Sequence, residues 1–333
     1  MKILVTGGTG YIGSHVTVDL LNKGHEVVIV DNLINSKVTV LDKITEITGK
    51  TPIFYYENLT NFEALQKIFD EHQFDSVIHF AGLKSVSESV ERPLLYYCEN
   101  ITGTINLLKC MQDKGVEKII FSSSATVYGD SDIKERLETM PTGQNIASPY
   151  GRTKYMIEEI LKDVCISDPN FSAVALRYFN PVGNHSSGLI GEEPNGIPNN
   201  LMPYIMKVAS GELQELSIYG NDYDTPDGTC RRDFIHVSDL AKGHLAALKA
   251  LETPGFKAYN LGTGTPTSVL EMVAAFEKIS GKPLPHRFVA RRPGDLAEIW
   301  ANPSLAKKEL GWQSELTIED ALKDTLTFLS NHQ

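Results

Sequence analysis

Residues 2–13 read Lys2-Ile3-Leu4-Val5-Thr6-Gly7-Gly8-Thr9-Gly10-Tyr11-Ile12-Gly13, a short apolar run followed by a cluster of glycines. Its apolar, β-branched start predicts a strand over Lys2–Thr6, and the pattern after Gly13 predicts a helix, so the glycines occupy a turn between the two. Glycine there permits a tight turn, lets backbone N–H groups approach a pyrophosphate, and allows the helix to pack closely on the strand. We therefore predict a dinucleotide site at the start of this helix.

Asp31 follows the second predicted strand, Glu26–Val30, about 20 residues after the glycines, at the spacing typical of an acid that binds a dinucleotide's ribose. A carboxylate at this position accepts hydrogen bonds from the ribose hydroxyls and repels a 2′-phosphate. The sequence therefore favours NAD over NADP.

The first 180 residues alternate short β-branched runs with helical stretches, a rhythm typical of βαβ units. The expected fold class is α/β, with a Rossmann-type doubly wound parallel sheet and a smaller C-terminal substrate-binding lobe. We predict strands over Lys2–Thr6, Glu26–Val30, Ile53–Tyr56, Ser76–Phe80, Lys118–Ser122 and Ser172–Arg177.

From about residue 180 to residue 233 the pattern dissolves into Gly, Pro, Asn and Asp, which is typical of functional loops. The last third returns to short strands and helices, among them Ala258–Leu261 and Thr317–Leu329. We expect a nucleotide-binding domain over residues 1–180 and a substrate-binding α/β lobe over residues 181–333. Residues 233–262 are expected to return to the first domain.

Tyr150 and Lys154 lie four residues apart, a spacing that places both side chains on one face of a helix. Ser124 lies at the end of the preceding strand, and in an open α/β sheet the carboxyl ends of strands border the ligand crevice. A phenol, with a pKa of about 10, is a poor base at neutral pH, but a nearby ammonium lowers that pKa by roughly 1–3 units. We therefore predict that Tyr150, made usable by Lys154, takes a proton from a substrate hydroxyl as hydride leaves the same carbon for NAD, while Ser124 holds the oxygen.

The composition excludes several classes of protein. Lys and Arg number 31 against 42 Asp and Glu, and the net charge of −11 argues against a general binder of nucleic acid or of anionic membranes. The apolar runs are far shorter than a membrane span, and no secretory signal opens the chain. The four cysteines form no C-x-x-C pair. We expect a cytoplasmic protein with reduced thiols, no metal site, and no nucleic-acid or membrane partner.

Several blocks of the sequence resemble those of the extended short-chain dehydrogenase/reductases, and most closely those of the UDP-galactose 4-epimerases. The resemblance extends over essentially the whole chain. The glycine turn and the Tyr/Lys pair are shared across the superfamily, whereas the later blocks are far more specific to the epimerases. The blocks lie at residues 6–15, 31–33, 79–84, 122–129, 177–183, 197–203 and 291–295.

The resemblance implies an isomerase of nucleotide-sugar and galactose metabolism that works without net redox change. Sugar C4 of UDP-galactose or UDP-glucose would lose hydride to NAD while Tyr150 takes the hydroxyl proton. The 4-keto sugar would then turn over in the pocket and regain hydride on its opposite face, so NAD must stay bound throughout. Because the family is commonly dimeric, the resemblance also implies a homodimer.

The resemblance assigns roles to individual residues by motif, with catalysis carried by Tyr150, Lys154 and Ser124. NAD would be bound by Gly7, Gly10, Tyr11, Ile12, Gly13, Asp31, Asn32, Asn35, Ser36, Asn58, Leu59, Phe80, Ala81, Gly82, Lys84, Asn100, Ser122, Tyr150, Lys154 and Tyr178. The UDP-sugar would be bound by Ser124, Tyr150, Asn180, Asn200, Leu201, Tyr219, Arg232, Arg292, Asp295 and Ile299. The two arginines would offset the chain's negative charge, since a guanidinium fork suits phosphate oxygens.

Three positions depart from the family's pattern. Asn58 stands where the family usually has an Asp that binds the adenine amino group, and its carbonyl is expected to accept that hydrogen bond instead. Ile299 is smaller than the Tyr found in related bacterial enzymes, so we expect a wider sugar pocket that tolerates N-acetylated UDP-sugars. Cys230 precedes Arg231 where a small residue is expected, and we have no physical account of it.

Three alternatives stay open on the sequence. Nucleotide-sugar 4,6-dehydratases share the fold, the cofactor and the Tyr/Lys pair, but they place Asp-Glu where this chain has Ala125-Thr126. A simple NAD-dependent dehydrogenase would exchange its nicotinamide at every turnover. A non-catalytic NAD-binding protein of the same fold would typically have lost the Tyr or the Lys, and both are present here.

Overall fold

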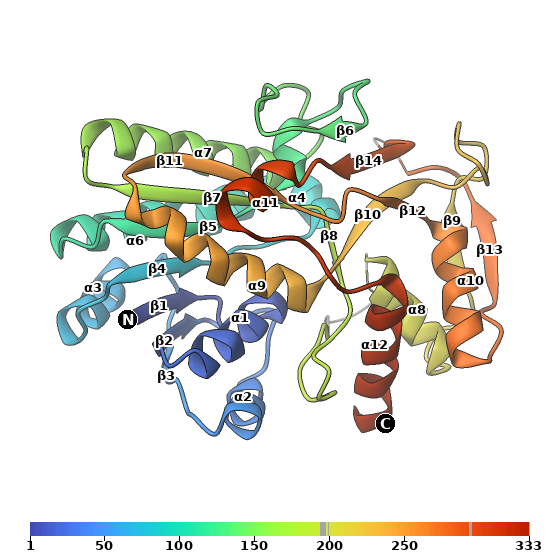
Figure 1. Cartoon of the computed structure of the whole chain (residues 1–333), viewed down its shortest axis with the longest axis horizontal. Helices are drawn as coiled ribbons and strands as arrows, with labels where there is room; N and C mark the ends of the chain where they lie inside the picture. The colour runs from blue at the N-terminus through green and yellow to red at the C-terminus, as the bar shows by residue number, and fades with distance from the viewer. Residues whose placement is uncertain (194–197, 199, 293–294, 333) are drawn as a thin grey trace.

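The computed structural model describes residues 1–193, 198, 200–292 and 295–332 (Figure 1). Ile197 and Asn199 of one family-like block, and Pro293 and Gly294 of another, lie outside the described residues.

A large sheet of seven parallel strands forms the centre of the molecule. Its strands are β1 (Lys2–Thr6), β2 (Glu26–Asp31), β3 (Ile53–Tyr56), β4 (Ser76–His79), β5 (Lys118–Ser124), β7 (Ser172–Tyr178) and β11 (Gly255–Leu261). They lie in the order β11-β7-β5-β4-β1-β2-β3. From β1 the strand order runs outward to β2 and β3 on one side and to β4, β5, β7 and β11 on the other. Open α/β sheets bind their ligands at such a point, here between β1 and β4.

Helices cover both faces of this sheet (Figure 1). One face carries α1 (Tyr11–Asn22), α2 (Val40–Thr48) and α9 (Val237–Ala247), and the other carries α3 (Phe62–Glu71), α6 (Gly103–Asp113) and α7 (Pro149–Ser167). Side chains alternate along β1, so that Ile3 and Val5 join the first core and Leu4 joins the second. The predicted α/β, doubly wound fold is confirmed.

The first helix ends where glycine allows the chain to turn. Gly24 adopts a φ of 83°, in the left-handed region that favours glycine, and its N–H donates to the carbonyl of Leu21 at 3.0 Å. The chain then enters β2 within two residues.

A smaller lobe holds two further sheets. One contains β12 (Pro266–Ser268), β10 (Arg231–His236), β14 (Glu298–Ala301) and β6 (Glu135–Arg136), with β8 (Asn180–Val182) pairing with β10; the other pairs β13 (His286–Val289) with β9 (Leu216–Tyr219). The helices α8 (Leu201–Ala209), α10 (Val269–Ser280) and α12 (Ile318–His332) pack around a core that includes Met202, Ile205, Phe276 and Leu322.

The expectation of irregular loops from about residue 180 to residue 233 was wrong for β8, α8, β9 and the start of β10. Pro203 lies in the first turn of α8, where a missing N–H breaks no helical hydrogen bond. Met202, Ile205 and Val208 then turn one face of the helix into the core of the smaller lobe. The abundance of Asn, Gly and Pro around this helix hid its short apolar period.

After β10 the chain returns to the large sheet. Helix α9 packs against α1, and β11 extends the sheet beside β7. Helix α11 (Ser304–Leu310) and Trp312 also join the core on this face, and the Trp312 indole N–H donates to the carbonyl of Asp239 at 2.9 Å.

The remaining short helices are α4 (Val86–Glu91), α5 (Pro93–Tyr96), the π-helix η1 (Tyr97–Thr102), and the 3₁₀ helices η2 (Ala125–Tyr128) and η3 (Leu248–Glu252). Across the described part of the chain, no helix has both the length and the apolar character needed to span a membrane.

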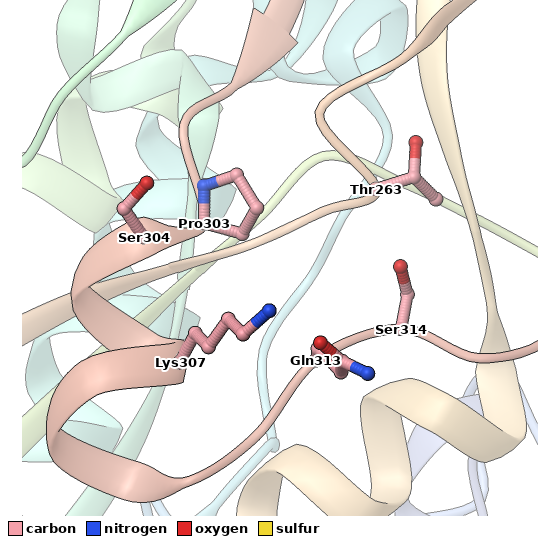
Figure 2. Close-up of a pocket in the computed structure, with 6 residues that line it drawn as sticks. All are labelled: Thr263, Pro303, Ser304, Lys307, Gln313 and Ser314. Carbon is pink, nitrogen blue, oxygen red and sulfur yellow. The ribbon is translucent and has the colours of Figure 1, made fainter.

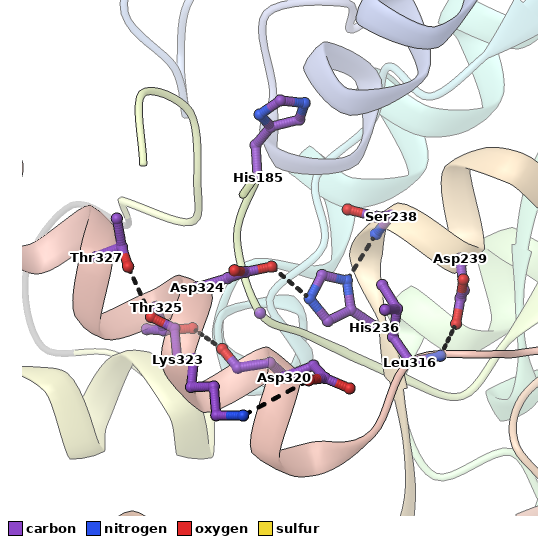
Figure 3. A network of polar contacts seen from close by, with 12 residues as sticks. His185, His236, Ser238, Asp239, Leu316, Asp320, Lys323, Asp324, Thr325 and Thr327 are labelled. Atoms are coloured by element: carbon purple, nitrogen blue, oxygen red, sulfur yellow. Dashed lines mark hydrogen bonds and ion pairs between the residues drawn. The ribbon is translucent and has the colours of Figure 1, made fainter. Parts of the chain in front are cut away.

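His236 and Asp239 hold α12 at the junction of the two lobes (Figure 3). The Nε2 atom of His236, at the end of β10, lies 3.3 Å from the Asp324 carboxylate on α12, and its Nδ1 accepts from the N–H of Ser238 at 3.0 Å. The Asp239 carboxylate accepts from the N–H of Leu316 at 2.7 Å, just before α12 begins. The C-terminal helix is thus fixed by polar contacts to the start of α9.

Candidate active site

The turn between β1 and α1 has little room for side chains. Gly7 adopts a φ of 72°, and a Cβ there would lie 2.7 Å from the backbone nitrogen of Ala81. A Cβ on Gly13 would lie 2.2 Å from the Gly7 carbonyl oxygen. Gly10 caps α1, so the N–H groups of the first helical turn, from Tyr11 onward, have no partner within the helix. Bare backbone and the positive end of a helix dipole therefore meet in one place.

Asp31 is held beside this turn at the carboxyl end of β2. Its carboxylate accepts from the backbone N–H groups of Thr9 at 3.2 Å and Leu33 at 2.9 Å. The hydroxyl of Ser36 lies 2.8 Å from that of Thr9. Asn32 and Asn35 belong to the same loop. The structure thus brings these four predicted NAD residues together next to the glycines.

Asn100 ties the loop after β4 to helix α7. Its Oδ1 accepts from the N–H of Leu83 at 2.8 Å, and its Nδ2 donates to the Leu83 carbonyl at 3.1 Å and to the Thr153 hydroxyl at 3.0 Å. The Thr153 hydroxyl donates in turn to the Tyr150 carbonyl at 2.7 Å. A Cβ on Gly82 would lie 3.1 Å from Asn100 Oδ1. The loop that carries Phe80, Ala81 and Gly82 is therefore held against the helix that carries Tyr150.

Lys84 and Asn200 share a carboxylate that sequence reasoning missed. Oxygen Oε1 of Glu192 accepts from Lys84 Nζ at 2.8 Å and from Asn200 Nδ2 at 3.0 Å. Lys84 is a predicted NAD residue and Asn200 a predicted sugar residue, so Glu192 lies between the two groups.

Tyr150, Lys154 and Ser124 converge at the carboxyl end of β5. Helix α7 begins at Pro149, and Ser148 caps it by accepting from the N–H of Gly151 at 3.1 Å, which places Tyr150 in its first turn. The Lys154 ammonium donates to the Ser122 carbonyl at 2.6 Å and lies 5.9 Å from the centre of the Tyr150 ring. The hydroxyl of Ser124 is hydrogen-bonded to the Tyr150 phenol.

The pKa of the Tyr150 phenol is raised, opposite to the expected direction. Burial raises this pKa because it disfavours the phenolate, and the hydrogen bond with Ser124 lowers it by a smaller amount. Burial also lowers the pKa of Lys154 to about 7, so its ammonium is only partly charged at neutral pH. Burial therefore sets the direction of both pKa shifts, which sequence spacing does not reveal.

Tyr178 and Phe80 meet His244 of α9 beside Lys154 and Ser122. The Tyr178 hydroxyl is hydrogen-bonded to His244 Nε2 and to the side chain of Ser122, and the Phe80 ring centre lies 4.9 Å from that of His244. Burial lowers the pKa of His244 to about 4, so its ring is neutral at pH 7. Four of the predicted cofactor residues, with Lys154 among them, thus line the ends of β4, β5 and β7.

A second cluster lies in the smaller lobe and contains the predicted phosphate residues. The Arg232 guanidinium donates to the Leu296 carbonyl at 2.8 Å and pairs with Asp295 at 3.4 Å. The Arg292 guanidinium lies 3.9 Å from the centre of the Tyr219 ring. These four predicted residues therefore form two pairs, Arg232 with Asp295 and Arg292 with Tyr219.

The other predicted sugar residues lie around this cluster or on the elements that lead to it. Ile299 of β14 is the parallel partner of Arg232 of β10. Asn180 begins β8, directly after the Tyr178 end of the large sheet, and Leu201 begins α8 after Asn200. Cys230 lies directly before β10. Burial raises the pKa of its thiol, so the thiol is protonated.

The comparisons with known proteins agree with this geometry. The sequence pattern of the "NAD dependent epimerase/dehydratase family" matches residues 3–262. The UDP-glucose 4-epimerase of Bacillus subtilis (strain 168) is 55% identical over 333 residues, covering 100% of this chain and 98% of that protein. That of Bos taurus is 52% identical over 330 residues, covering 97% of this chain and 94% of that protein. The crystal structure of UDP-glucose 4-epimerase from Bifidobacterium longum in complex with NAD+ and UDP superposes with a TM-score of 0.96 at 50% identity, covering 99% of this chain and 98% of that one.

The chain belongs to the NAD dependent epimerase/dehydratase family. The resemblance to the epimerases is confirmed, and within this family the protein is an isomerase whose cofactor is NAD. The residues present fit that cofactor. The glycine turn leaves the backbone bare where a pyrophosphate needs it, and Asp31 is fixed at the strand end where a ribose needs an acceptor.

Sequence reasoning missed the buried ion pair that positions α7, the helix that carries Tyr150 and Lys154. Glu158 of α7 accepts from the Arg177 guanidinium of β7 at 3.0 and 2.7 Å, and from the Ser123 hydroxyl at 2.5 Å. A signal was present, because Glu158 continues the four-residue spacing from Tyr150 through Lys154.

A small hollow beside α11 lies apart from these residues (Figure 2). Figure 2 shows Lys307 reaching from α11 toward Gln313 and Ser314 of the segment that follows. The residues that line it include none of the predicted site residues; they are Thr263, Pro303, Ser304, Lys307, Gln313 and Ser314. Among the described residues, His, Cys, Asp and Glu form no group of three suited to a metal ion.

Proposed function

We propose that this chain is a UDP-glucose 4-epimerase that interconverts UDP-galactose and UDP-glucose on an NAD that it does not release. The observation that carries the proposal is the meeting of the Tyr150 phenol, the Ser124 hydroxyl and the Lys154 ammonium at the carboxyl end of β5, on the same edge of the sheet as the glycine turn after β1. The relatives named above support the choice of substrate.

NAD, when bound, accepts hydride from sugar C4 and gives it back. The glycine turn would hold its pyrophosphate, Asp31 its ribose, and Lys84 would bring a positive charge to the same cleft. Tyr11, Ile12, Phe80, Tyr178 and the loops around Asn32 and Asn58 would enclose the remainder of the cofactor.

The proton of the sugar's 4-hydroxyl is handled by Tyr150. In the proposed cycle, the Tyr150 oxygen takes this proton, and Ser124, already hydrogen-bonded to the phenol, bridges to the sugar oxygen. The Lys154 ammonium is held by the Ser122 carbonyl. In the proposed cycle its charge would oppose the effect of burial on the phenol. After the 4-keto sugar has turned, Tyr150 returns the proton to the same oxygen.

The smaller lobe would bind the UDP part of the substrate. Arg232 and Arg292 offer two guanidinium groups in a chain of net charge −11, and both are already oriented, by Asp295 and by the Tyr219 ring. Asn180, Asn200 and Leu201 would line the route from the phosphates to Tyr150. Ile299, next to Arg232 in the sheet, would leave room for an N-acetyl group on the sugar.

The proposal also covers the domain boundaries of the chain and its location in the cell. The NAD-binding domain comprises residues 1–180 together with residues 233–262, and the UDP-sugar lobe is built from the remainder of residues 181–333. β11 and α9, within the returning segment, support this division because they pack on the large sheet. We also propose that the enzyme works in the cytoplasm.

A homodimer is proposed as well. Apolar side chains stand exposed on neighbouring helices α4, α5 and α7: Val86, Val90, Leu94, Met156 and Ile166, of which Leu94 and Ile166 are each 81% exposed. A second copy of the chain that covered this face would bury them.

The test is to add UDP-galactose to the purified protein without any NAD and to look for UDP-glucose. Product is expected, because the protein would carry its own cofactor. The Tyr155→Phe variant, changed on the same helix, should behave alike, whereas Tyr150→Phe should form product far more slowly. Turnover that occurs only after NAD is added would favour a dehydrogenase and would overturn the proposal.

A further inference from the structure

The Asn58 side chain, just after β3, is oriented by its own turn. Its Oδ1 accepts from the N–H of Thr60 at 2.9 Å and from the Thr60 hydroxyl at 2.9 Å. These two bonds fix the amide so that its nitrogen faces the other way. The Asn58 carbonyl is therefore already committed, contrary to the expectation that it accepts a hydrogen bond from adenine.

The amide nitrogen of Asn58 points to a carboxylate that lies 41 residues away in the sequence. Asn58 Nδ2 donates to Glu99 Oε2 at 3.1 Å. A carboxylate has two oxygens and about four acceptor positions, so one hydrogen bond from Asn58 leaves most of the acceptor capacity of Glu99 available. At this pair, Asn58 presents a donor and Glu99 presents the acceptor.

The pair lies at the edge of the sheet where the base of a dinucleotide belongs. Asp31, the proposed ribose residue, is the register partner of Tyr56 at the end of β3, and the N–H of Glu57 donates to the Asp31 carbonyl at 3.2 Å. Because β3 is the outermost strand beyond β2, a base attached to that ribose lies over the end of β3.

The position of Glu99 is fixed by its neighbour. Glu99 belongs to the π-helix η1, and the next residue, Asn100, is 3% exposed and forms three hydrogen bonds with Leu83 and Thr153. π-helical turns are often found at functional sites. The backbone of Glu99 is therefore anchored, through Asn100, to the loop after β4 that contains Leu83.

We propose that Glu99 selects the base of the cofactor by accepting a hydrogen bond from the 6-amino group of adenine, with Asn58 orienting its carboxylate. This inference rests on the proposed NAD-dependent function. Hypoxanthine carries a carbonyl oxygen where adenine carries the amino group. The Glu99 carboxylate and this carbonyl are both hydrogen-bond acceptors, so no hydrogen bond could form between them. The site would thus discriminate between the two bases.

The test uses the purified protein with its bound NAD. The protein is unfolded in urea to release its NAD and refolded in mixtures of nicotinamide hypoxanthine dinucleotide and NAD in known ratios, and the bound nucleotides are identified by mass spectrometry. The wild-type protein should prefer NAD by about tenfold or more, since a hydrogen bond to a charged partner is lost with the analogue. Glu99→Gln should lose most of this preference, because an amide can also donate to the hypoxanthine oxygen.

Two further variants make the result specific. Glu57→Gln removes the same charge at the same end of β3 and should keep the wild-type preference. Asn58→Asp combined with Glu99→Gln returns one carboxylate to the pair and should regain the preference for NAD. An unchanged preference in Glu99→Gln, its loss in Glu57→Gln, or its absence from the double variant would each overturn the role of Glu99. A wild-type protein that binds neither dinucleotide would instead refute the proposed function.

Discussion

Tyr150 lies where two influences on its phenol act in opposite directions. Burial raises its pKa, whereas the hydrogen bond with Ser124 lowers it, and Lys154 is held by Ser122 rather than by the phenol itself. A buried phenol is kept protonated until a positive charge comes close enough to stabilise the phenolate. The groups proposed for catalysis are therefore in place, but their charge states depend on what is bound beside them.

Replacing Tyr150 by Phe removes the proposed proton acceptor while keeping the ring. Turnover of UDP-galactose should fall by about 10²–10⁴-fold, the usual contribution of a positioned acid or base. The melting temperature should change little. Tyr155→Phe, on the same helix, is the matched control and should keep its activity; comparable rates for the two variants would contradict the role of Tyr150.

Replacing Lys154 by Met removes the ammonium near the phenol. The pKa of Lys154 is about 7, so the group carries charge below that pH and loses it above. Without this charge the apparent pKa of Tyr150 should rise, and the acidic limb of the pH profile of kcat should move to higher pH. Lys162→Met, at an exposed pair with Glu159 on the same helix, should leave the profile in place. An unmoved profile in Lys154→Met would show that this lysine does not tune the phenol.

At the scale of the element, α7 is the part that the site depends on most. It carries Tyr150 and Lys154, and the buried pair of Glu158 with Arg177 fixes it against β7. Arg177 also donates to the Tyr128 hydroxyl at 2.9 Å, so the same guanidinium holds η2, which directly follows Ser124. One buried cation, the Arg177 guanidinium, therefore holds helix α7 and the segment after the β5 end in fixed positions relative to each other.

Glu158→Gln should destabilise the protein, because it leaves the Arg177 guanidinium buried without its counter-charge. The free energy of unfolding, measured with urea, should fall by about 3–5 kcal/mol. Glu159→Gln alters the exposed partner of Lys162 on the same helix and should cost about 0–1 kcal/mol. Equal effects of the two substitutions would show that the pair at Glu158 does not hold α7.

At the scale of the whole molecule, the buried histidines make stability depend on pH. Burial lowers the pKa of His15 and of His79 to about 3, and that of His244 to about 4. Below the unfolded pKa of about 6.5, the unfolded chain takes up protons that the folded protein excludes. Asp19, Glu138 and Asp233 act in the opposite direction, since burial raises the pKa of each carboxyl, that of Asp19 to about 6. Burial also lowers the pKa of His25, His185 and His236, which adds to the effect of the first three histidines.

The folded protein should therefore lose stability as the pH falls from about 6.5 toward 4. We expect the urea midpoint to be lower at pH 4.5 than at pH 7.5. His79→Asn should show a smaller difference between the two pH values, because Asn keeps a polar partner for Thr6 and Thr104 without titrating. Equal midpoints in the wild-type protein would contradict this account.

The proposed homodimer can be tested on the same scale. The wild-type protein should have the mass of two chains by light scattering after size-exclusion chromatography. Leu94→Glu puts a charge in the exposed apolar face of α4, α5 and α7 and should give the mass of one chain. Phe288→Glu, at an exposed position of β13, is the control and should stay dimeric. A monomeric wild type would refute the proposed dimer.

Elements whose causes are local could be predicted from the sequence. A β-branched run makes β1, the glycines after it admit no side chain, and Tyr150 and Lys154 share a face because an α-helix repeats every 3.6 residues. Six strands of the large sheet begin at the predicted residues, because each depends only on its own apolar pattern. α8 escaped prediction because its short apolar face lies among turn-forming residues.

Tertiary structure alone decided what depends on residues far apart in the chain. Asn58 meets Glu99, Lys84 meets Glu192, and Glu158 meets Arg177 only after the strands have paired, and no local pattern encodes these contacts. The direction of the Tyr150 pKa was likewise decided by packing. Spacing along a helix brings a charge near the phenol, but only the folded protein removes the water that would have stabilised the phenolate.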